Sequence, residues 1–366
     1  MKRIFLLAGE VSGDQLGAWY VARRFHGMQE PVYLEAVGGP CLEQAGIKIF
    51  RNFDDLNVIG LTEILGKLPF YYRFMQQLLA RLRDGNFDEL VLIDFPGFNL
   101  RLAKRVHKLL PHVRIVYAAP PQLWCWGAWR IKTIQKTCTE VVVLYPFEVA
   151  WYAERGVVAR YLGSPVVERV VAAYCLIAQR KKHIAITVGS RATEIAALLP
   201  VCVAIIKQLA QEFADLNFVI PCASSYSLAS IKNLLFQAGL ELYRERIIFV
   251  ADEQEKMRML GQCSVAIVKP GTVTLELALL KIPSLMIFKT SWLNNLLARL
   301  VMQVPYRALP NLLVGSELVP EFVQERCDSG IVADRTAELY RWFVAGDVRY
   351  AQSVEHYEAV RKAMTP

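Results

Sequence analysis

The sequence has few of the side-chain groupings that make metal or disulfide sites. Its eight cysteines stand singly without a CxxC pair, and none of its five histidines has a cysteine or a second histidine three or four residues away. Single cysteines are typical of reduced thiols in a large intracellular protein, whereas a zinc site needs clustered ligands. We therefore expect neither a metal site nor a disulfide framework.

Long uncharged runs are also missing. The run between Arg114 and Arg130 contains two consecutive prolines, and the slightly longer run between Asp215 and Lys232 is interrupted by a proline and several polar residues, so no segment reaches the roughly 18 apolar residues of a membrane-spanning helix. The apolar start at Ile4 to Ala8 meets the carboxylate of Glu10 too soon for a signal peptide. These absences predict a cytoplasmic protein.

Charged residues make up only 21% of the chain and hydrophobic residues 54%, which excludes intrinsic disorder. A chain of 366 residues is longer than one ordinary core and fits two domains. Lys and Arg exceed Asp and Glu by 42 to 34, so the net charge of +8 favours a polyanionic partner such as a phosphate or an anionic lipid. Nucleic acid is disfavoured, because no run of Lys and Arg carries interleaved aromatic residues.

Short apolar runs alternate with segments of helical period, and this pattern starts twice. It predicts an α/β domain at 1–165, a second at 183–325, and C-terminal helices at 326–366 that pack back on the first domain. Each domain is expected to be a doubly wound, Rossmann-like parallel sheet. Two such domains facing a cleft have the outline of the GT-B glycosyltransferase fold, which alone does not establish a function. The expected strands are 3–8, 32–37, 90–94, 113–118, 140–144, 159–162, 183–188, 217–221, 246–250 and 264–268, and the expected helices are 14–26, 99–110, 193–212, 226–238 and 272–280.

The loop from Gly9 to Asp14 follows the first strand and runs into a helix. Its glycines lie four residues apart, unlike the GxGxxG pattern of a dinucleotide site, which argues against NAD. Small residues such as Gly13 let backbone amides approach a ligand, and the carboxylate of Glu10 could hold a sugar. The alternative is a tight turn with Asp14 as a helix cap.

A second strand delivers Asp94 to its carboxyl end, where ligands bind in open parallel sheets. Its carboxylate could take the proton of an acceptor hydroxyl, as a general base does. The alternative is a structural carboxylate that caps the following helix.

Two loops of the second domain carry groups that suit a nucleotide. Ser190 and Arg191 precede a helix, where free amides and a guanidinium can cradle a diphosphate. Gly271 and Thr272 open another helix with Glu276 one turn in, and its carboxylate could accept both ribose hydroxyls. The alternatives are an ordinary capped turn and a solvated acid in the first turn of a helix.

Two segments have the composition of basic amphipathic surface helices. Residues 61–83 mix large apolar side chains with Lys67 and three arginines, and residues 293–302 follow Trp292 and include Arg299. Both could touch an anionic membrane surface, and core packing is the alternative for either one.

A set of motifs, in order along nearly the whole chain, resembles the lipid-A-disaccharide synthase family. The motifs are AGEVSGD (8–14), VGGP (37–40), NVIGLTEILGKLP (57–69), DFPGFN (94–99), PPQLWCW (120–126), PFE (146–148), GSRATE (189–194), GTVTLE (271–276), PNLLVG (310–315) and VQE (323–325).

The resemblance implies an inverting transfer from UDP-2,3-diacylglucosamine to the 6-hydroxyl of 2,3-diacylglucosamine 1-phosphate, which forms a β-1,6 disaccharide and releases UDP. It implies that no metal or other cofactor takes part, and that the enzyme works at the inner face of the cytoplasmic membrane. Asp94 and Glu10 are then the candidate catalytic residues. The expected substrate-binding residues are Ser12, Gly13, Asn99, Ser190, Arg191, Gly271, Thr272, Glu276, Asn311 and Gln324.

The chain departs from the family's pattern at several positions. Gly97 stands where the family often carries an acid, and Lys269 stands where a small residue is usual. If that acid is the usual base, Asp94 or Glu10 must serve here, and Lys269 could add a phosphate contact.

Three alternatives remain open at this point: a MurG-like transferase with a lipid-linked acceptor, a UDP-N-acetylglucosamine 2-epimerase, and a degenerate copy that binds UDP-sugar or lipid without turnover. The sequence also leaves open the acyl-chain length and a homodimer.

Overall fold

The computed structural model describes residues 1–27, 30–53, 68–174, 179–189, 191–222, 228–302 and 304–365. The chain divides into two compact units, Met1–Pro165 and Val166–Thr365. The cleft expected between the domains stays a prediction.

The first domain contains a seven-stranded sheet in which every neighbouring pair is parallel. β1 lies between β2 and β4, so the chain builds the sheet outward from β1 in two directions. The strands, in spatial order, are β3 (Lys48–Asn52), β2 (Val32–Gly38), β1 (Lys2–Ala8), β4 (Glu89–Ile93), β5 (Arg114–Ala118), β6 (Glu140–Val143) and β7 (Ala159–Tyr161).

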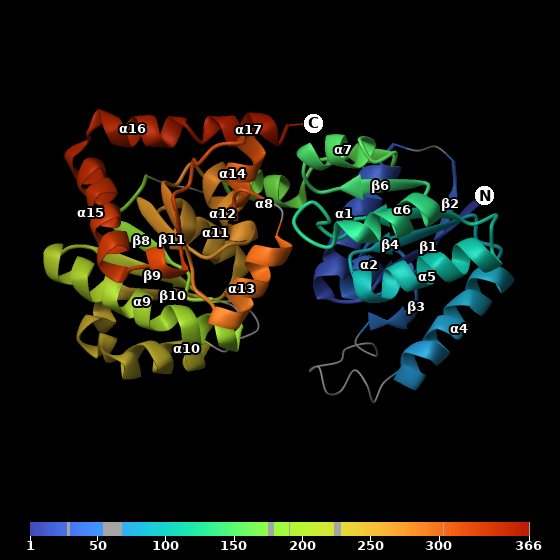
Figure 1. Cartoon of the computed structure of the whole chain (residues 1–366), viewed down its shortest axis with the longest axis horizontal. Coiled ribbons are helices and arrows are strands. Elements are labelled where there is room, and N and C mark those ends of the chain that lie inside the picture. The colour runs from blue at the N-terminus through green and yellow to red at the C-terminus, as the bar shows by residue number, and fades with distance from the viewer. Residues whose placement is uncertain are drawn as a thin grey trace. The chain divides into compact units, whose positions relative to one another are not determined.

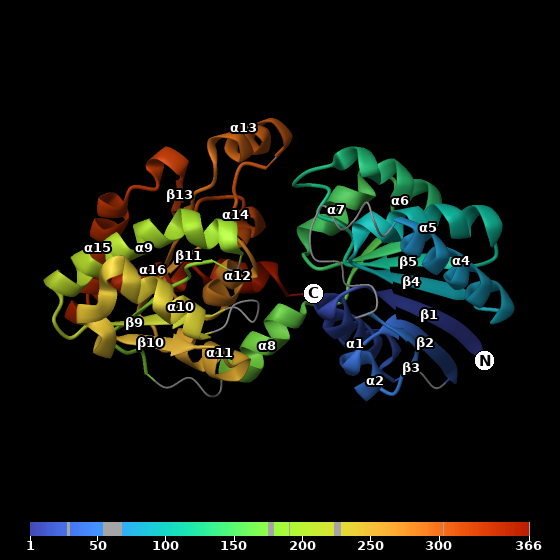
Figure 2. The same cartoon turned by 90° about the horizontal axis from the view of Figure 1, so that it is seen from below.

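Helices cover both faces of this sheet (Figure 2). Alternate side chains of a strand point to opposite faces. Accordingly, Ile4 and Leu6 pack with α1 (Val11–Phe25) and α2 (Pro40–Gln44), whereas Phe5 and Leu7 pack with the helices of the other face. Those helices are α4 (Leu68–Asp84), α5 (Pro96–Leu109), α6 (Ile131–Thr137), which follows a short 3-10 turn η2 (Ala128–Arg130), and α7 (Phe147–Ala153).

The second domain contains a six-stranded parallel sheet with β8 at the corresponding central place, between β9 and β11. The predicted class, two doubly wound parallel α/β domains, is confirmed. In spatial order the strands are β10 (Ile247–Val250), β9 (Asn217–Pro221), β8 (His183–Ile186), β11 (Val265–Val268), β12 (Ser284–Phe288) and β13 (Glu321–Val323). The α-helices are α8 (Pro165–Tyr174), α9 (Ala192–Glu212), α10 (Leu228–Leu235), α11 (Glu253–Gly261), α12 (Thr272–Leu279), α13 (Trp292–Val301), α14 (Leu309–Val314), α15 (Ser329–Ala345), α16 (Val348–Glu355) and α17 (Glu358–Ala363).

The C-terminal helices contact the second domain, as Figure 1 shows. α15 packs on α9, and α17 packs on α12 and α14. The amide of Ser284 in β12 donates a hydrogen bond of 3.1 Å to the hydroxyl of Tyr357. The expected return of residues 326–366 to the first domain stays a prediction.

One helix corrects the expectation that no segment could span a membrane. Among the described residues, α9 alone is long and apolar enough by length and composition. Several of its side chains, including Leu198, Ile205 and Leu209, are buried in the core of the second sheet. Core helices pass such a test because one face packs on a sheet, so α9 fits a core position.

The centre of each sheet is a topological switch point, where the strand order reverses. In open α/β sheets, ligands bind outside the carboxyl ends of the strands at such a point. The relevant loops follow β1 and β4 in the first domain, and β8 and β11 in the second. These four loops are the ones that the sequence motifs single out.

Candidate active site

The loops after β1 and β4 touch each other through a glycine. A Cβ atom added to Gly9 would lie 2.6 Å from the ring of Phe95, so a larger residue would push the loops apart. Next to this contact, Glu10 is exposed, and its Oε1 accepts a hydrogen bond of 2.6 Å from the hydroxyl of Ser12. The structure therefore brings the two predicted residues Glu10 and Ser12 together beside the β4 loop.

The first turn of α1 offers backbone donors at the same place. Gly13 lies in this turn, and the residue before the helix, Glu10, makes no capping hydrogen bond with its side chain. The first amides of a helix have no acceptor within the helix, so a ligand can use them. The predicted contact through Gly13 is compatible with this arrangement and stays a prediction.

Asp94 is held in an unusual backbone conformation. Asp94 and Phe95 both have φ of 45°, in the left-handed region that residues with a side chain rarely adopt. Two hydrogen bonds of 2.8 Å to the carbonyl oxygen of Asp94 fix this turn, one from Nδ2 of Asn99 and one from the hydroxyl of Tyr117. Strain of this kind persists where the surrounding contacts over-determine the backbone, and it is common at active sites.

The environment of Asp94 suits a proton acceptor. Burial raises the pKa of its carboxyl above the usual range, and the negative charge of Glu10 raises it further. A base works best when its pKa approaches the working pH, so both effects favour this role. Asn99 helps to position Asp94 through the hydrogen bond to its carbonyl oxygen. Its predicted contact with substrate stays a prediction.

Asp14 has a structural role, close to the alternative that the sequence left open. It is buried and accepts hydrogen bonds from the amides of Gly39 at 2.7 Å, Cys41 at 2.8 Å and Leu42 at 3.2 Å. These amides belong to the start of α2, so Asp14 caps a neighbouring helix rather than its own.

Glu148 joins two of the sequence motifs in a way that spacing did not reveal. It accepts hydrogen bonds from the indole Nε1 of Trp124 at 2.7 Å and from the amides of Leu144 and Tyr145. Burial raises the pKa of Glu148 to about 7, although these three donors favour the ionised form. The segments after β5 and β6 are thereby tied together at the carboxyl edge of the first sheet.

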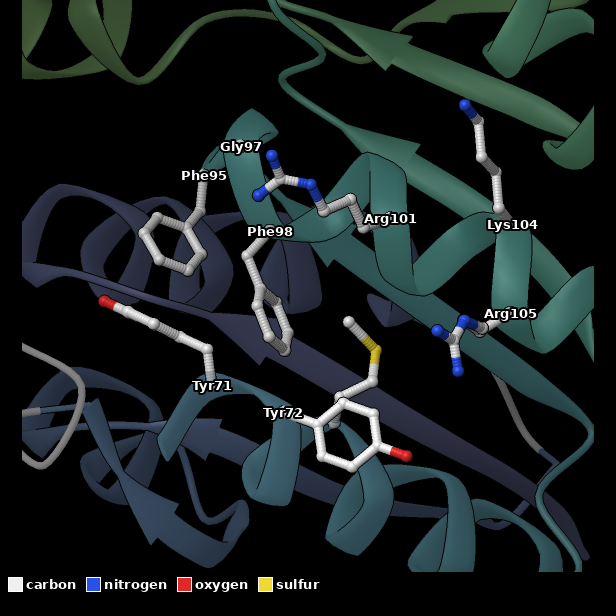
Figure 3. Close-up of a pocket in the computed structure, with 9 residues that line it drawn as sticks. Tyr71, Tyr72, Phe95, Gly97, Phe98, Arg101, Lys104 and Arg105 are labelled. Carbon is white, nitrogen blue, oxygen red and sulfur yellow. The ribbon is translucent and has the colours of Figure 1, made fainter. Parts of the chain in front are cut away.

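An aromatic groove lies between α4 and α5, beside the Asp94 loop (Figure 3). It has a volume of about 730 Å³ and contains Gly97, where an added Cβ would meet no atom of the described residues within 4 Å. The acid that the family often carries at this position would therefore find open space. The other lining residues are Tyr71, Tyr72, Met75, Phe95, Phe98, Arg101, Lys104 and Arg105.

The aromatic groove refines the expectation for the segment 61–83. Residues 61–67 lie outside the described part of the chain, and Phe74, one of the large apolar side chains of this segment, is 1% exposed and belongs to the core. Tyr72 is 59% exposed instead. In the second domain, Trp292 on α13 is exposed as well. Contact of either helix with a membrane stays a prediction.

At the second switch point, two cations converge on one carboxylate. Arg191 stands at the start of α9 and contacts Glu194 at 3.1 Å, and Nζ of Lys269 lies 3.2 Å from the other oxygen of Glu194. Lys269 also donates its amide to the hydroxyl of Thr187. The structure thus brings Lys269 next to the predicted Arg191. Ser190 lies outside the described residues.

The loop after β11 presents backbone and a hydroxyl to solvent. Gly271 has φ of 144°, which favours glycine, and Thr272 beside it is exposed at the start of α12. Glu276 differs from the solvated acid considered above, since it is buried and forms an ion pair of 2.6 Å with Arg169 of α8. A contact of Glu276 with ribose stays a prediction.

Asn311 and Gln324 have different environments. Asn311 is fully buried. Its Nδ2 donates hydrogen bonds to Val319 and Glu321, and its Oδ1 accepts hydrogen bonds from two backbone amides, so its side chain is already satisfied within the chain. Gln324 is buried just after β13 with φ of 54°, and its Nε2 has no partner among the described residues. Buried polar groups rarely lack a partner, so Gln324 has a donor available for a ligand.

Sequence reasoning missed Tyr117, Glu194 and Arg169. Tyr117 lies within an apolar strand, where periodicity indicates only core. Glu194 and Arg169 are pairing partners of predicted residues, and no spacing rule links Arg169 to Glu276, 107 positions later. In the described part of the chain, no group of three or more His, Cys, Asp or Glu side chains could hold a metal ion.

The two parallel sheets, with loops for ligands at both switch points, define a two-domain α/β protein of the GT-B type. A putative UDP-N-acetylglucosamine 2-epimerase from Listeria monocytogenes has a TM-score of 0.64 and 11% identity, over 96% of this chain and 91% of that chain. A UDP-GlcNAc 2-epimerase from Neisseria meningitidis, solved bound to UDP-GlcNAc, has a TM-score of 0.62 and 11% identity, over 97% and 94%. At this identity, the likeness shows the fold alone.

Sequence comparison is more specific. The family model described as lipid-A-disaccharide synthetase matches residues 4–357. The lipid-A-disaccharide synthase of Geobacter sulfurreducens is 30% identical over 96% of this chain and 89% of its own length, and lipid-A-disaccharide synthase 2 of Legionella pneumophila is 31% identical over 92% and 88%. The chain belongs to the lipid-A-disaccharide synthase family and is a glycosyltransferase that forms the lipid A disaccharide. The resemblance seen in the motifs is confirmed.

Proposed function

We propose that Asp94 is the base in the transfer of a diacylglucosamine unit from UDP-2,3-diacylglucosamine to the 6-hydroxyl of 2,3-diacylglucosamine 1-phosphate. Its carboxylate takes the hydroxyl proton while the oxygen bonds to the anomeric carbon. The bond from that carbon to the diphosphate breaks, and UDP leaves with the electron pair. Attack opposite the leaving group inverts the anomeric centre. The observation that carries this proposal is the fixed, half-buried position of Asp94 at the first switch point, next to the negative charge of Glu10.

Glu10 has a supporting role in this proposal. It is exposed beside Asp94, and its charge keeps the pKa of Asp94 high. Ser12 orients the Glu10 carboxylate, which can then accept a hydrogen bond from a sugar hydroxyl. Amides of the first turn of α1, including that of Gly13, complete the sugar side.

The leaving diphosphate is assigned to the second domain. Arg191 and Lys269 supply positive charge where negative charge develops, and both lie beside the first turn of α9. Gln324 offers its unpartnered Nε2 to an oxygen of the nucleotide. Asn311 positions the segment that leads to β13 through Glu321. Further proposed contacts are Asn99 on the acceptor side and Ser190, Gly271, Thr272 and Glu276 on the UDP side.

The aromatic groove is the proposed place for acyl chains. Phe98 and Met75 form its inner wall, and Tyr72 stands at its exposed side. The groove begins at Gly97, one helical turn from Asp94, so a sugar at Asp94 could extend its chains along α4. The enzyme would then work peripherally at the inner face of an anionic membrane, where its substrates reside.

A direct assay tests this function. Purified protein is incubated with UDP-2,3-diacylglucosamine and 2,3-diacylglucosamine 1-phosphate in detergent, and the disaccharide and UDP are quantified. We expect one UDP for each disaccharide. UDP binding without any product would contradict the proposal.

A degenerate UDP-sugar-binding copy is a second candidate, because Gly97 stands where the family often carries an acid. The open space at Gly97 makes this alternative testable. If the chain is inactive and Gly97→Asp gains turnover, the missing acid explains the loss. If the native chain turns over and Gly97→Asp changes the rate little, Asp94 is sufficient as the base.

A further inference from the structure

The positive charge of the chain is concentrated in one segment of the first domain. Between Asp94 and Glu140 the sequence contains eight Arg and Lys residues and no Asp or Glu. This number equals the whole excess of 42 basic over 34 acidic residues. The rest of the chain is therefore neutral when summed, and any attraction to a polyanion is expected to act through this segment.

Four of these residues line a lysine groove between α5 and α6, which pack on each other (Figure 1). It has a volume of about 720 Å³ and contains no acidic side chain. All four lysines are exposed, and within the described residues none has a carboxylate at ion-pair distance. The lining residues are Lys104, His107, Lys108, Lys132, Thr133, Lys136 and Thr137.

Several cations on other helices are arranged differently. Arg244 pairs with Glu241, Lys256 with Glu253, and further cations pair in the same way three residues apart. Such pairs cancel the local field, whereas several unpaired ammonium groups around one hollow repel each other until an anion binds among them. The lysine groove therefore favours a multivalent anion such as a phosphate group.

Apolar side chains also occur on the segments that border the lysine groove. Lys104 also borders the aromatic groove and points away from its rings, as Figure 3 shows. Directly before α6, Trp129 is 66% exposed, and Arg130 lies over its ring. Tryptophan is enriched where proteins meet the interface of a bilayer, and lysines next to it meet lipid phosphates.

We propose that the lysine groove binds the phosphate headgroup of an anionic membrane lipid that is not a substrate, and so docks the first domain on the bilayer. The choice of a lipid over a nucleic acid rests on the proposed function, because a chain with acylated substrates must meet them at a membrane. Ammonium groups bind phosphate oxygens as point charges, so the site selects charge rather than a particular headgroup.

Vesicle sedimentation with a triple variant tests the proposal. Lys108→Gln, Lys132→Gln and Lys136→Gln are combined, and Lys104 is kept because it also borders the aromatic groove. Since each lysine near an anionic surface contributes about a five-fold gain in binding, we expect a loss of roughly a hundred-fold on phosphatidylglycerol vesicles. Binding to phosphatidylcholine vesicles should be weak for both proteins. An unchanged partition on phosphatidylglycerol would overturn the proposal.

A charge-matched control separates the groove from net charge. Lys181→Gln, Arg361→Gln and Lys362→Gln remove the same three charges from exposed positions of the second domain. We expect this control to lose less than about three-fold, because these residues do not line the lysine groove and scattered surface charges are screened by salt. Equal losses of vesicle binding for the two variants would mean that net charge causes the attraction, and would overturn the proposal for the lysine groove.

Two further probes distinguish other anions. If millimolar inorganic phosphate raises the melting temperature of the native chain but not of the groove variant, while both bind vesicles equally, the site serves free phosphate and the lipid assignment falls. If the groove variant loses binding to a single-stranded RNA oligomer and keeps vesicle binding, the partner is a nucleic acid. Vesicle loss with no change in either probe supports the proposal.

Turnover in detergent separates this proposal from the proposed function. We expect the groove variant to make disaccharide from detergent-dispersed substrates with unchanged kcat and KM. A raised KM for 2,3-diacylglucosamine 1-phosphate would mean that the groove holds the substrate's own phosphate, which overturns the assignment to a second lipid. If the native chain makes no product, the proposed function fails, while the vesicle comparison still decides the groove.

Discussion

At the switch point of the first domain, Asp94 and Glu10 place two carboxylates close enough for one to raise the pKa of the other. At the corresponding point of the second domain, Arg191 and Lys269 place two cations on Glu194. The two sheets have the same topology, with the first strand of each in the centre. The same fold therefore has an acidic edge in the first domain and a basic edge at the equivalent place in the second.

The difference follows the demands of glycosyl transfer. Deprotonation of a hydroxyl needs a base whose pKa lies near the working pH. Partial burial and a neighbouring carboxylate both raise the pKa of a carboxyl group toward that pH. Departure of a diphosphate needs positive charge and amide donors. In the proposed reaction, neither edge could serve the other half without a change of charge.

The largest expected effect is on the first edge. Asp94→Asn keeps the shape of the side chain and removes its ability to accept a proton at neutral pH, so kcat should fall by roughly 10³-fold, within the usual range for a general base. UDP affinity, measured by titration calorimetry, should stay within a few-fold, because the nucleotide is assigned to the other domain.

Asp84→Asn is the matched control, since Asp84 is an exposed acid of the same domain. It should leave kcat unchanged. Near-normal turnover of Asp94→Asn would move the role of base to Glu10, and a parallel loss of UDP affinity would mean that the two edges do not act separately.

Asp14, a second acid of the same edge, should matter for stability rather than for catalysis. Asp14→Ala removes the acceptor of three amides at the start of α2, which leaves buried donors without partners. The free energy of unfolding, from urea denaturation, should fall by about 2–4 kcal/mol. UDP affinity should be retained.

Gln15→Ala, at the exposed neighbouring position, should change the stability little. A stable Asp14→Ala variant with lost turnover would instead place Asp14 in the catalytic machinery.

Asp14 and Asp94 also show how far the sequence could predict this molecule. Alternation of apolar runs and the motif order predicted two doubly wound sheets and both edges, because buried parallel strands and their following loops leave a strong local pattern. β3, β12 and β13 were missed, and β13 is only three residues long. β3 has exposed alternate residues at a sheet edge, and β12 follows its helix after only a short turn.

The individual roles were less predictable, because they depend on contacts between distant segments. Nothing within AGEVSGD indicates that Asp14 meets the amides of α2, or that Phe95 requires a glycine at position 9. Likewise, the pair Arg169–Glu276 and the unpartnered Nε2 of Gln324 arise only when the second sheet assembles. Motifs located the edges, and packing determines which side chain is available.

A smaller effect is expected at the second edge. Lys269→Gln removes one charge-assisted contact to the diphosphate, so UDP affinity should fall about ten-fold or somewhat more in calorimetry. The pH dependence of turnover should keep its midpoint, because the proton acceptor lies elsewhere.

Arg244→Gln provides the control, since Arg244 pairs with Glu241 on the surface of the same domain. It should bind UDP normally. If Lys269→Gln binds UDP as tightly as the native chain, Lys269 only neutralises Glu194, and the diphosphate depends on Arg191 alone.

The smallest expected effect concerns the coupling of Glu10 to Asp94. Asp94 must be ionised to accept a proton, so activity falls as the pH drops through its raised pKa. Glu10→Gln removes a negative charge that raises this pKa, so the acid limb of kcat/KM should move to lower pH.

Ser12→Ala separates charge from orientation, because it removes the hydrogen bond to Glu10 and keeps both carboxylates. Its acid limb should stay close to that of the native chain. A limb that Glu10→Gln does not move would show that burial alone sets the pKa of Asp94, whereas complete loss of activity in Glu10→Gln would make Glu10 the base. In that case the two carboxylates would exchange roles. The acidic edge of the first domain would still supply the base, and the basic edge of the second domain would still supply the positive charge.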